Sequence, residues 1–112
     1  MSQNDSENKY LQRVDEIDRT IHSPTRLKIL IVLSTLVNAD FTFLTRTTGL
    51  TRGNLSANLR KLEEVGYVAI EKGFVERVPR TLVELTDKGR DALQIYHENM
   101  RAVLDNLLNQ IS

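Results

Sequence analysis

The stretch RGNLSANLRK, residues 52–61, concentrates polar and cationic side chains at a spacing suited to binding an anionic surface rich in hydrogen-bonding groups. In a helix that turns by about 100° per residue, Leu55 and Leu59 lie on one side, and Leu62 extends the same row. The other side of the helix carries only small or polar residues: Gly53, Asn54, Ser56, Ala57, Arg60 and Lys61. This second face bears hydrogen-bonding and cationic groups and would let the helix backbone approach a ligand closely.

No residues in the chain combine into the pattern of a catalytic or metal centre. The sequence has no cysteine, which excludes disulfides, thiolate metal ligands and cysteine nucleophiles and agrees with a reducing cytoplasm. His22 and His97 stand alone, without metal-ligand spacing around them, and are typical of capping or surface histidines. Asp15, Glu16 and Asp18 have no partner histidine or acid at a suitable spacing, so we expect them to face solvent. With phosphate-binding glycine loops, nucleophile elbows and zinc-protease helices also missing, no enzyme, cofactor or metal is predicted.

The charge of the chain is distributed unevenly although its formal net charge is zero. Residues 42–90 carry nine basic and six acidic residues, a net charge of +3. Residues 1–22 and residues 91–112 each have a net charge of −2. A local patch matters more than the total because charges in solution are screened beyond about 8 Å. The middle of the chain is therefore suited to an anionic partner.

Hydrophobic spacing and capping residues predict mainly helices with one hairpin. Residues 1–8 are polar and predicted to be a disordered tail, and residues 9–22 a helix. Ser23 and Pro24 begin a core helix ending near Val37, whose apolar run of nine residues is too short to cross a membrane. A short helix over residues 42–47 leads to Gly49, which suits a left-handed turn, and Thr51 caps the next helix.

A change of hydrophobic period after Gly66 indicates strands. The runs YVAIEK and TLVELT are rich in β-branched residues and predict a hairpin over residues 67–86. Its loop is expected to be long and to contain Arg77, Pro79 and Arg80, because Pro79 limits regular pairing. Thr86 then caps a final helix over residues 87–111. A short helix, a tight turn and a polar-faced helix followed by a hairpin make a winged helix-turn-helix domain, predicted over residues 23–90.

The span from Pro24 to Leu93 resembles the winged helix-turn-helix transcriptional regulators related to the MarR and ArsR groups. The similarity lies in SPTRLKIL, in FTFLTRTTGLTRGNLSANLRKLEEVGYV and in LTDKGRDAL, in this order. The resemblance implies a homodimer that binds double-stranded DNA and regulates transcription. It does not identify the effector, because metal-sensing relatives use cysteine ligands and this chain has no cysteine.

The polar helix is predicted to enter the major groove, where small residues and side chains such as Asn, Ser and Arg can reach the base edges. The hairpin is predicted to contact phosphates or the minor groove. The candidate DNA-binding residues are Thr51, Arg52, Gly53, Asn54, Ser56, Ala57, Arg60, Lys61, Lys72, Arg77 and Arg80.

The part of the last helix in the segment 91–112 is predicted to dimerise. A helix of 25 residues is about 37 Å long, longer than the domain can cover, and its apolar residues recur with a heptad spacing. The candidate interface residues are Tyr10, Val14, Ile17, Leu93, Tyr96, Met100, Val103, Leu104, Leu107, Leu108 and Ile111. Alternatively, the two terminal helices pack on each other within one subunit.

Two other functions remain open. The domain could dock on a protein without binding DNA specifically, which would fit the zero net charge. It could also bind single-stranded nucleic acid, although the chain has only three phenylalanines and three tyrosines with which to stack bases. A small-molecule effector could occupy a cleft between the long helices, but no convergent polar residues mark such a site.

Overall fold

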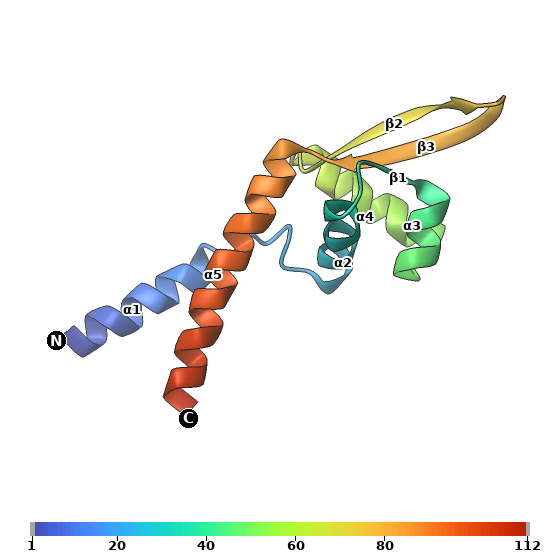
Figure 1. The fold of residues 1–112 in the computed structure, drawn as a ribbon. Coiled ribbons are helices and arrows are strands. Elements are labelled where there is room, and N and C mark those ends of the chain that lie inside the picture. The colour runs from blue at the N-terminus through green and yellow to red at the C-terminus, as the bar shows by residue number, and fades with distance from the viewer. Residues whose placement is uncertain (1, 112) are drawn as a thin grey trace.

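The protein folds into helices that support a three-stranded antiparallel sheet. The structure, a computed structural model, describes the backbone of residues 2–111 and the side chains of residues 9–111. Along this part of the chain the elements are α1 (Ser2–Asp15), α2 (Pro24–Ser34), β1 (Ala39–Asp40), α3 (Phe41–Thr48), α4 (Arg52–Glu64), β2 (Val68–Val75), β3 (Val78–Leu85) and α5 (Asp87–Ile111). Helices α2, α3 and α4 cluster below the sheet, whose β2–β3 hairpin projects to one side, while α1 and α5 extend to the other (Figure 1). The predicted winged-helix fold is confirmed.

The core forms where α2, α3 and α4 meet the base of the sheet. The leucine row of α4 is buried there, as predicted from its spacing. Burying one such side chain stabilises the fold by roughly 1.5–3 kcal/mol. The large side chains that are fully enclosed are Ile21, Ile29, Leu30, Leu33, Leu44, Leu55, Leu59, Leu62 and Val83.

The turn between α3 and α4 has the conformation predicted from its glycine. Gly49 adopts a left-handed conformation with φ of 75°, and its N–H donates to the carbonyl of Thr45 at 3.0 Å. The Thr51 hydroxyl accepts from the N–H of Asn54 at 3.1 Å and so caps α4. The two helices of the motif are thereby joined within three residues, which sets the direction of α4.

The hairpin differs from the long loop predicted around Pro79. Pairing is continuous to Val75 and Val78, and only Glu76 and Arg77 form the turn, both with positive φ. Positive φ at both central residues is the signature of a type I′ turn, whose twist matches that of the strands. In such a hairpin the pair next to the turn exchanges hydrogen bonds and the following pair does not. Pro79, paired with Phe74, therefore needs no N–H toward β2.

The N-terminal segment also differs from the prediction of one helix over residues 9–22. Helix α1 ends at Asp15 because the Asp18 carboxylate accepts hydrogen bonds from the N–H groups of Thr20 at 2.9 Å and Ile21 at 3.1 Å, which forms a turn instead. The backbone of α1 begins at Ser2, in the segment predicted to be a disordered tail, since adding residues to an existing helix is easier than starting one. Met1 lies outside the described residues.

Asp18 was expected to face solvent, but it also connects the turn after α1 to the base of β2. Its carboxylate accepts a hydrogen bond from the hydroxyl of Tyr67. Burial, together with this hydrogen bond and the negative charge of Asp18, raises the pKa of Tyr67 from 10.0 to about 12. The phenol therefore remains a neutral donor throughout the physiological range.

The first turn of α5 packs against Tyr67, the residue directly before β2. The Thr86 hydroxyl accepts from the N–H of Gly89 at 2.9 Å and so caps the helix as predicted. Gly89 is buried, and a Cβ atom at this position would lie 2.2 Å from the carbonyl oxygen of Tyr67. Only glycine allows α5 to start this close to the sheet.

Candidate nucleic-acid interface

The polar face of α4 that was predicted from the sequence is exposed to solvent. Its three leucines are buried, whereas every candidate DNA-binding residue on the helix and at its cap is exposed. These exposed residues are Thr51, Arg52, Gly53, Asn54, Ser56, Ala57, Arg60 and Lys61. At Gly53 an added Cβ would have no heavy atom within 4 Å, so the fold itself does not require glycine there.

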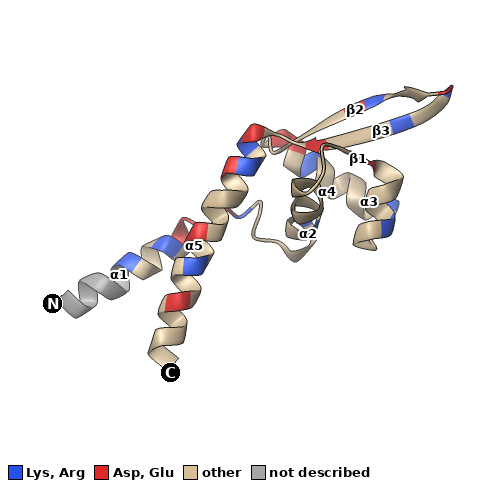
Figure 2. Cartoon of the chain, viewed as in Figure 1, with Lys and Arg blue, Asp and Glu red and all other residues tan. Residues whose placement is uncertain are grey.

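A cleft of about 500 Å³ separates α4 from the base of the hairpin. Basic residues reach it from two elements: Arg52 and Arg60 from α4, and Lys72 from β2. Basic positions on α4 and on the hairpin strands are visible in Figure 2. Glu63 contributes one acid to the lining, and this acid was not predicted from the sequence. The remaining lining residues are Phe41, Ser56, Leu59, Ile70 and Thr81.

The register of the hairpin separates its three basic residues. Side chains alternate between the two faces of a strand, and cross-strand partners share a face. Lys72 and its partner Thr81 therefore lie on the face that borders the cleft. Arg80, next to Thr81, lies on the opposite face, and Arg77 is exposed in the turn at the tip. The three residues were predicted to act alike, but only Lys72 faces the same space as the cations of α4.

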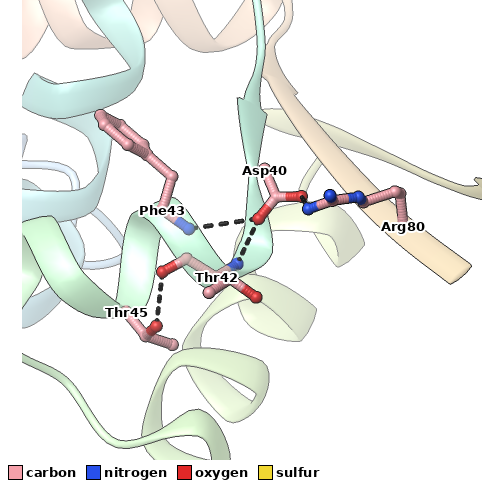
Figure 3. Close-up of polar contacts among 5 residues, drawn as sticks. All are labelled: Asp40, Thr42, Phe43, Thr45 and Arg80. Carbon is pink, nitrogen blue, oxygen red and sulfur yellow. Dashed lines mark hydrogen bonds and ion pairs between the residues drawn. The ribbon is translucent and has the colours of Figure 1, made fainter. Parts of the chain in front are cut away.

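Arg80 is engaged within the subunit. Its Nη1 donates to Oδ2 of Asp40 at 3.0 Å (Figure 3). Oδ1 of Asp40 meanwhile accepts from the N–H groups of Thr42 at 2.7 Å and Phe43 at 3.2 Å, and so caps α3. One carboxylate thus joins the first helix of the motif to the hairpin. Arg80 is consequently a weaker candidate for DNA contact than its place in the predicted hairpin loop suggested.

Hydrogen bonding outweighs burial at Asp40. Burial works to raise the pKa of this carboxyl. The hydrogen bonds from the Phe43 N–H, from Arg80 and from the Thr42 N–H, with the positive charge of Arg80, act in the opposite direction and lower the pKa from 3.8. Asp40 is therefore ionised throughout the physiological range.

Arg52 is held over an aromatic ring at the edge of the cleft. Its guanidinium carbon lies 4.7 Å from the centre of the Phe41 ring, within range of a cation–π interaction. Phe41 is the first residue of α3 and Arg52 the first of α4. Stacking limits the rotamers of Arg52 and leaves its donors available at the edge of the guanidinium.

Asn58 was not singled out from the sequence, yet it lies in a chain of hydrogen bonds on the other flank of α4. Its Oδ1 accepts from Nη1 of Arg26 at 3.1 Å, and its Nδ2 donates to Oδ1 of Asn54 at 2.6 Å. The signal available in the sequence was the spacing of four residues between Asn54 and Asn58, which places both on one side of a helix.

Nine of the eleven candidate interface residues fall into two groups. Ile17, Leu93, Tyr96 and Met100 pack in or against the core. Tyr96 has little surface for a partner contact, because its side chain is 8% exposed and its hydroxyl lies 2.9 Å from Nδ1 of His22. The residues largely open to solvent are Val14, Leu104, Leu107, Leu108 and Ile111.

Helices α1 and α5 also pack on each other within the subunit, as the alternative prediction held. A hollow of about 360 Å³ lies between them, lined by Tyr10, Leu11, Val14, Val103, Asn106, Leu107 and Gln110. It is mainly apolar, and none of the described residues that line it is charged. Tyr10 and Val103 are thus half-buried in the chain's own structure.

The turn-linked pair α3 and α4, with the hairpin that follows, defines the chain as a winged helix-turn-helix protein. It belongs to the family of winged helix DNA-binding domains, whose model matches residues 25–104. An uncharacterized protein of Methanocaldococcus jannaschii is 37% identical over 78 residues, which cover 70% of this chain and 85% of that protein. The predicted resemblance to winged-helix transcriptional regulators is confirmed.

Solved structures agree with this assignment. A transcriptional regulator homologue from Pyrococcus horikoshii has a TM-score of 0.80 and 35% identity, covering 86% of this chain and 97% of its own. The repressor CouR, bound to a 23-mer DNA duplex, has a TM-score of 0.70 and 23% identity, covering 98% of this chain and 75% of its own. A MarR-family protein of Enterococcus faecalis also has this fold. Across residues 2–111, no helix is both long and apolar enough to cross a membrane.

Proposed function

We propose that this protein is a sequence-specific regulator of transcription that binds duplex DNA as a homodimer. Helix α4 enters the major groove, and the hairpin contacts phosphates and the adjacent minor groove. The observation that carries the proposal is the uncovered polar face of α4, which continues into a cleft bordered by Arg52, Arg60 and Lys72. A phosphate strand running between helix and hairpin would meet cations from both sides.

Dimerisation rests on the apolar surface left open on α5. Leu104 is 52% exposed and Ile111 is 73% exposed, although both lie in a row that continues the packed part of the helix. A row of exposed large apolar residues on a soluble protein is typical of an interaction surface. A two-fold dimer would present two α4 helices about 34 Å apart, as successive major grooves require.

DNA binding is tested by mobility shift with random duplex at about 50 mM salt, where unspecific phosphate contacts are strong. Selection of duplexes from a random pool then reports whether a preferred, pseudo-palindromic site exists. Arg60→Ala should reduce discrimination between sequences by about 1–3 kcal/mol if Arg60 makes a bidentate base contact. Arg77→Ala should weaken binding to all sequences alike. Unchanged binding by both variants would overturn the assignment of the reading surface.

A second candidate function, docking on a protein, is favoured by the tip of the hairpin. Phe74 is 75% exposed, and Val75 and Val78 beside it are also open to solvent. Exposed apolar residues of this kind suit a protein contact. Retention on heparin and a duplex shift at low salt support the first function, while the absence of both supports the second.

A further inference from the structure

The flank of α4 that faces α2 carries a directed chain of three side chains. Nη1 of Arg26 donates to Oδ1 of Asn58 at 3.1 Å. Nδ2 of Asn58 donates to Oδ1 of Asn54 at 2.6 Å and to the Asn54 carbonyl at 2.9 Å. Arg26 itself is anchored by its Nε, which donates to the carbonyl of Thr20 at 2.5 Å.

The chemistry of arginine sets the direction of this chain. A guanidinium has only donors, so the atom of Asn58 that faces Arg26 must be its amide oxygen. The amide nitrogen of Asn58 then faces Asn54, where it requires an acceptor. This places Oδ1 of Asn54 on the α2 side and leaves its Nδ2 as the amide atom free to meet a ligand. The orientation of both amides thus follows from Arg26.

We propose that Arg26 and Asn58 are positioning residues that make Asn54 a hydrogen-bond donor toward DNA and so determine which base it accepts. This inference rests on the proposed function. A free Asn makes two bonds to adenine through its oxygen and nitrogen together. With the oxygen engaged by Asn58, Asn54 presents its Nδ2 and favours a base whose major-groove edge offers acceptors, namely guanine through N7 and O6, thymine through O4 or adenine through N7 alone. Cytosine, which offers only its N4 donor there, is rejected.

The first test inverts the polarity of the contact. In Asn54→Asp the carboxylate still accepts from Nδ2 of Asn58 but presents an acceptor outward. Duplex selection with this variant should change one base position per half-site from an acceptor-bearing base to cytosine. In the parent the same position should be a base with a major-groove acceptor, that is guanine, thymine or adenine, and not cytosine. Selection of cytosine by the parent at the position that Asn54→Asp alters would overturn the proposal.

The second test removes the positioning residues while keeping Asn54. Asn58→Ala and Arg26→Lys should each lower discrimination at that one position by about five- to tenfold, the value of a lost hydrogen bond. Lysine cannot hold Thr20 and Asn58 together, although it keeps the charge. Preferences elsewhere in the site should stay unchanged, whereas damage to the fold would weaken them all. Asn38→Ala, at an exposed asparagine between α2 and β1, serves as the matched control.

A measurement on the free protein separates this inference from the proposed function. The side-chain amide protons of Asn58 should exchange slowly with solvent and become fast in Arg26→Lys. If they are fast in the parent, the chain of hydrogen bonds does not exist and the inference is wrong, whatever the protein binds. If they are slow but Asn58→Ala retains full discrimination, the positioning role is wrong and DNA binding stands. A parent that binds no duplex would overturn both proposals.

Discussion

Asp40 and Arg80, 40 residues apart in the sequence, are joined by a 3.0 Å ion pair through which the cap of α3 holds the middle strand of the sheet. Asp40 belongs to β1, which pairs with β3 at Ala39–Val83 and Asp40–Leu82. The hairpin is thus attached to the helix-turn-helix unit by backbone and side chain together. Its direction relative to α4, and hence the width of the cleft, depends on this attachment.

Asp40→Ala should destabilise the protein more than Asp40→Asn. Asparagine is as good a helix cap as aspartate, whereas alanine leaves the N–H groups of Thr42 and Phe43 without their acceptor. We expect a loss of about 0.5–2 kcal/mol in the free energy of unfolding for Asp40→Ala. For Asp40→Asn the loss should be below about 1 kcal/mol, since the ion pair with Arg80 is partly exposed. Denaturant unfolding of both variants is the measurement, and equal losses would contradict the capping role.

The same carboxyl should make stability depend on acid. Because its pKa in the folded protein lies below the ordinary value of 3.8, the folded state favours the ionised form. Its contribution is fully present above that value and disappears as the pH falls through the lower, folded pKa. The difference in unfolding free energy between the parent and Asp40→Asn should therefore be constant from neutral pH to about 4 and shrink below it. A difference that grows in acid would have the wrong sign.

Lys72→Ala and Arg80→Ala form a matched pair on the two faces of the hairpin. Lys72 borders the cleft, so its loss should reduce the slope of log affinity against log salt by about 0.9 for one phosphate contact. Arg80 is bound to Asp40 on the opposite face, so its loss should leave that slope nearly unchanged. Binding titrations with duplex at several salt concentrations distinguish the two. A larger effect for Arg80 would show that the opposite face of the hairpin meets DNA.

Gly89→Ala should destabilise the fold, with Gly73→Ala as its control. The new Cβ at Gly89 would lie 2.2 Å from the Tyr67 carbonyl oxygen, so α5 or β2 must move. Such overpacking destabilises proteins by about 1–3 kcal/mol. At Gly73 nothing lies within 4 Å of the added atom, and the change should stay within about 0.5 kcal/mol. Thermal and denaturant unfolding would refute the close approach if the two variants were equally stable.

Gly53→Ala should separate stability from binding. Alanine is favoured over glycine in a helix by up to about 1 kcal/mol, and the site is open, so the variant should be more stable. If the backbone of α4 approaches the bases closely, the extra methyl group should nevertheless weaken specific DNA binding. A variant that gains stability and keeps full affinity would show that Gly53 does not face the DNA.

The helix-turn-helix unit could be predicted from sequence because its signals are local. The leucine spacing in α4, the cap at Thr51 and the left-handed Gly49 each act within one turn of a helix. The prediction of a long hairpin loop was wrong because Glu76 and Arg77 are not the Asn-Gly pair that usually marks a type I′ turn. Without the correct turn, the side chains could not be assigned to the two faces of the strands, because a shift of one residue moves every side chain to the other face. The placement of Lys72 and Arg80 on opposite faces of the hairpin could therefore not be predicted from the sequence.

Other features depended on contacts between distant segments. The Asp18 turn that ends α1 is stabilised partly by Tyr67, and the Asn58 chain depends on Arg26, 32 residues earlier. Neither pairing has a periodic signal in the sequence. Tyr96 fitted the heptad of a dimer helix, but the first half of α5 packs on its own subunit. Hydrophobic spacing identifies which face of a helix is covered, and tertiary structure decides what covers it.

The DNA-binding role of the uncovered face of α4 is tested directly by an NMR titration of the isotope-labelled protein with a random duplex at low salt. Backbone amide resonances should shift at residues 51–61 and at residues 72–77, and the shifts should diminish as salt is added. Shifts confined to α5, or no shifts at protein concentrations where the fold is intact, would contradict the assignment of α4 as the DNA-binding helix.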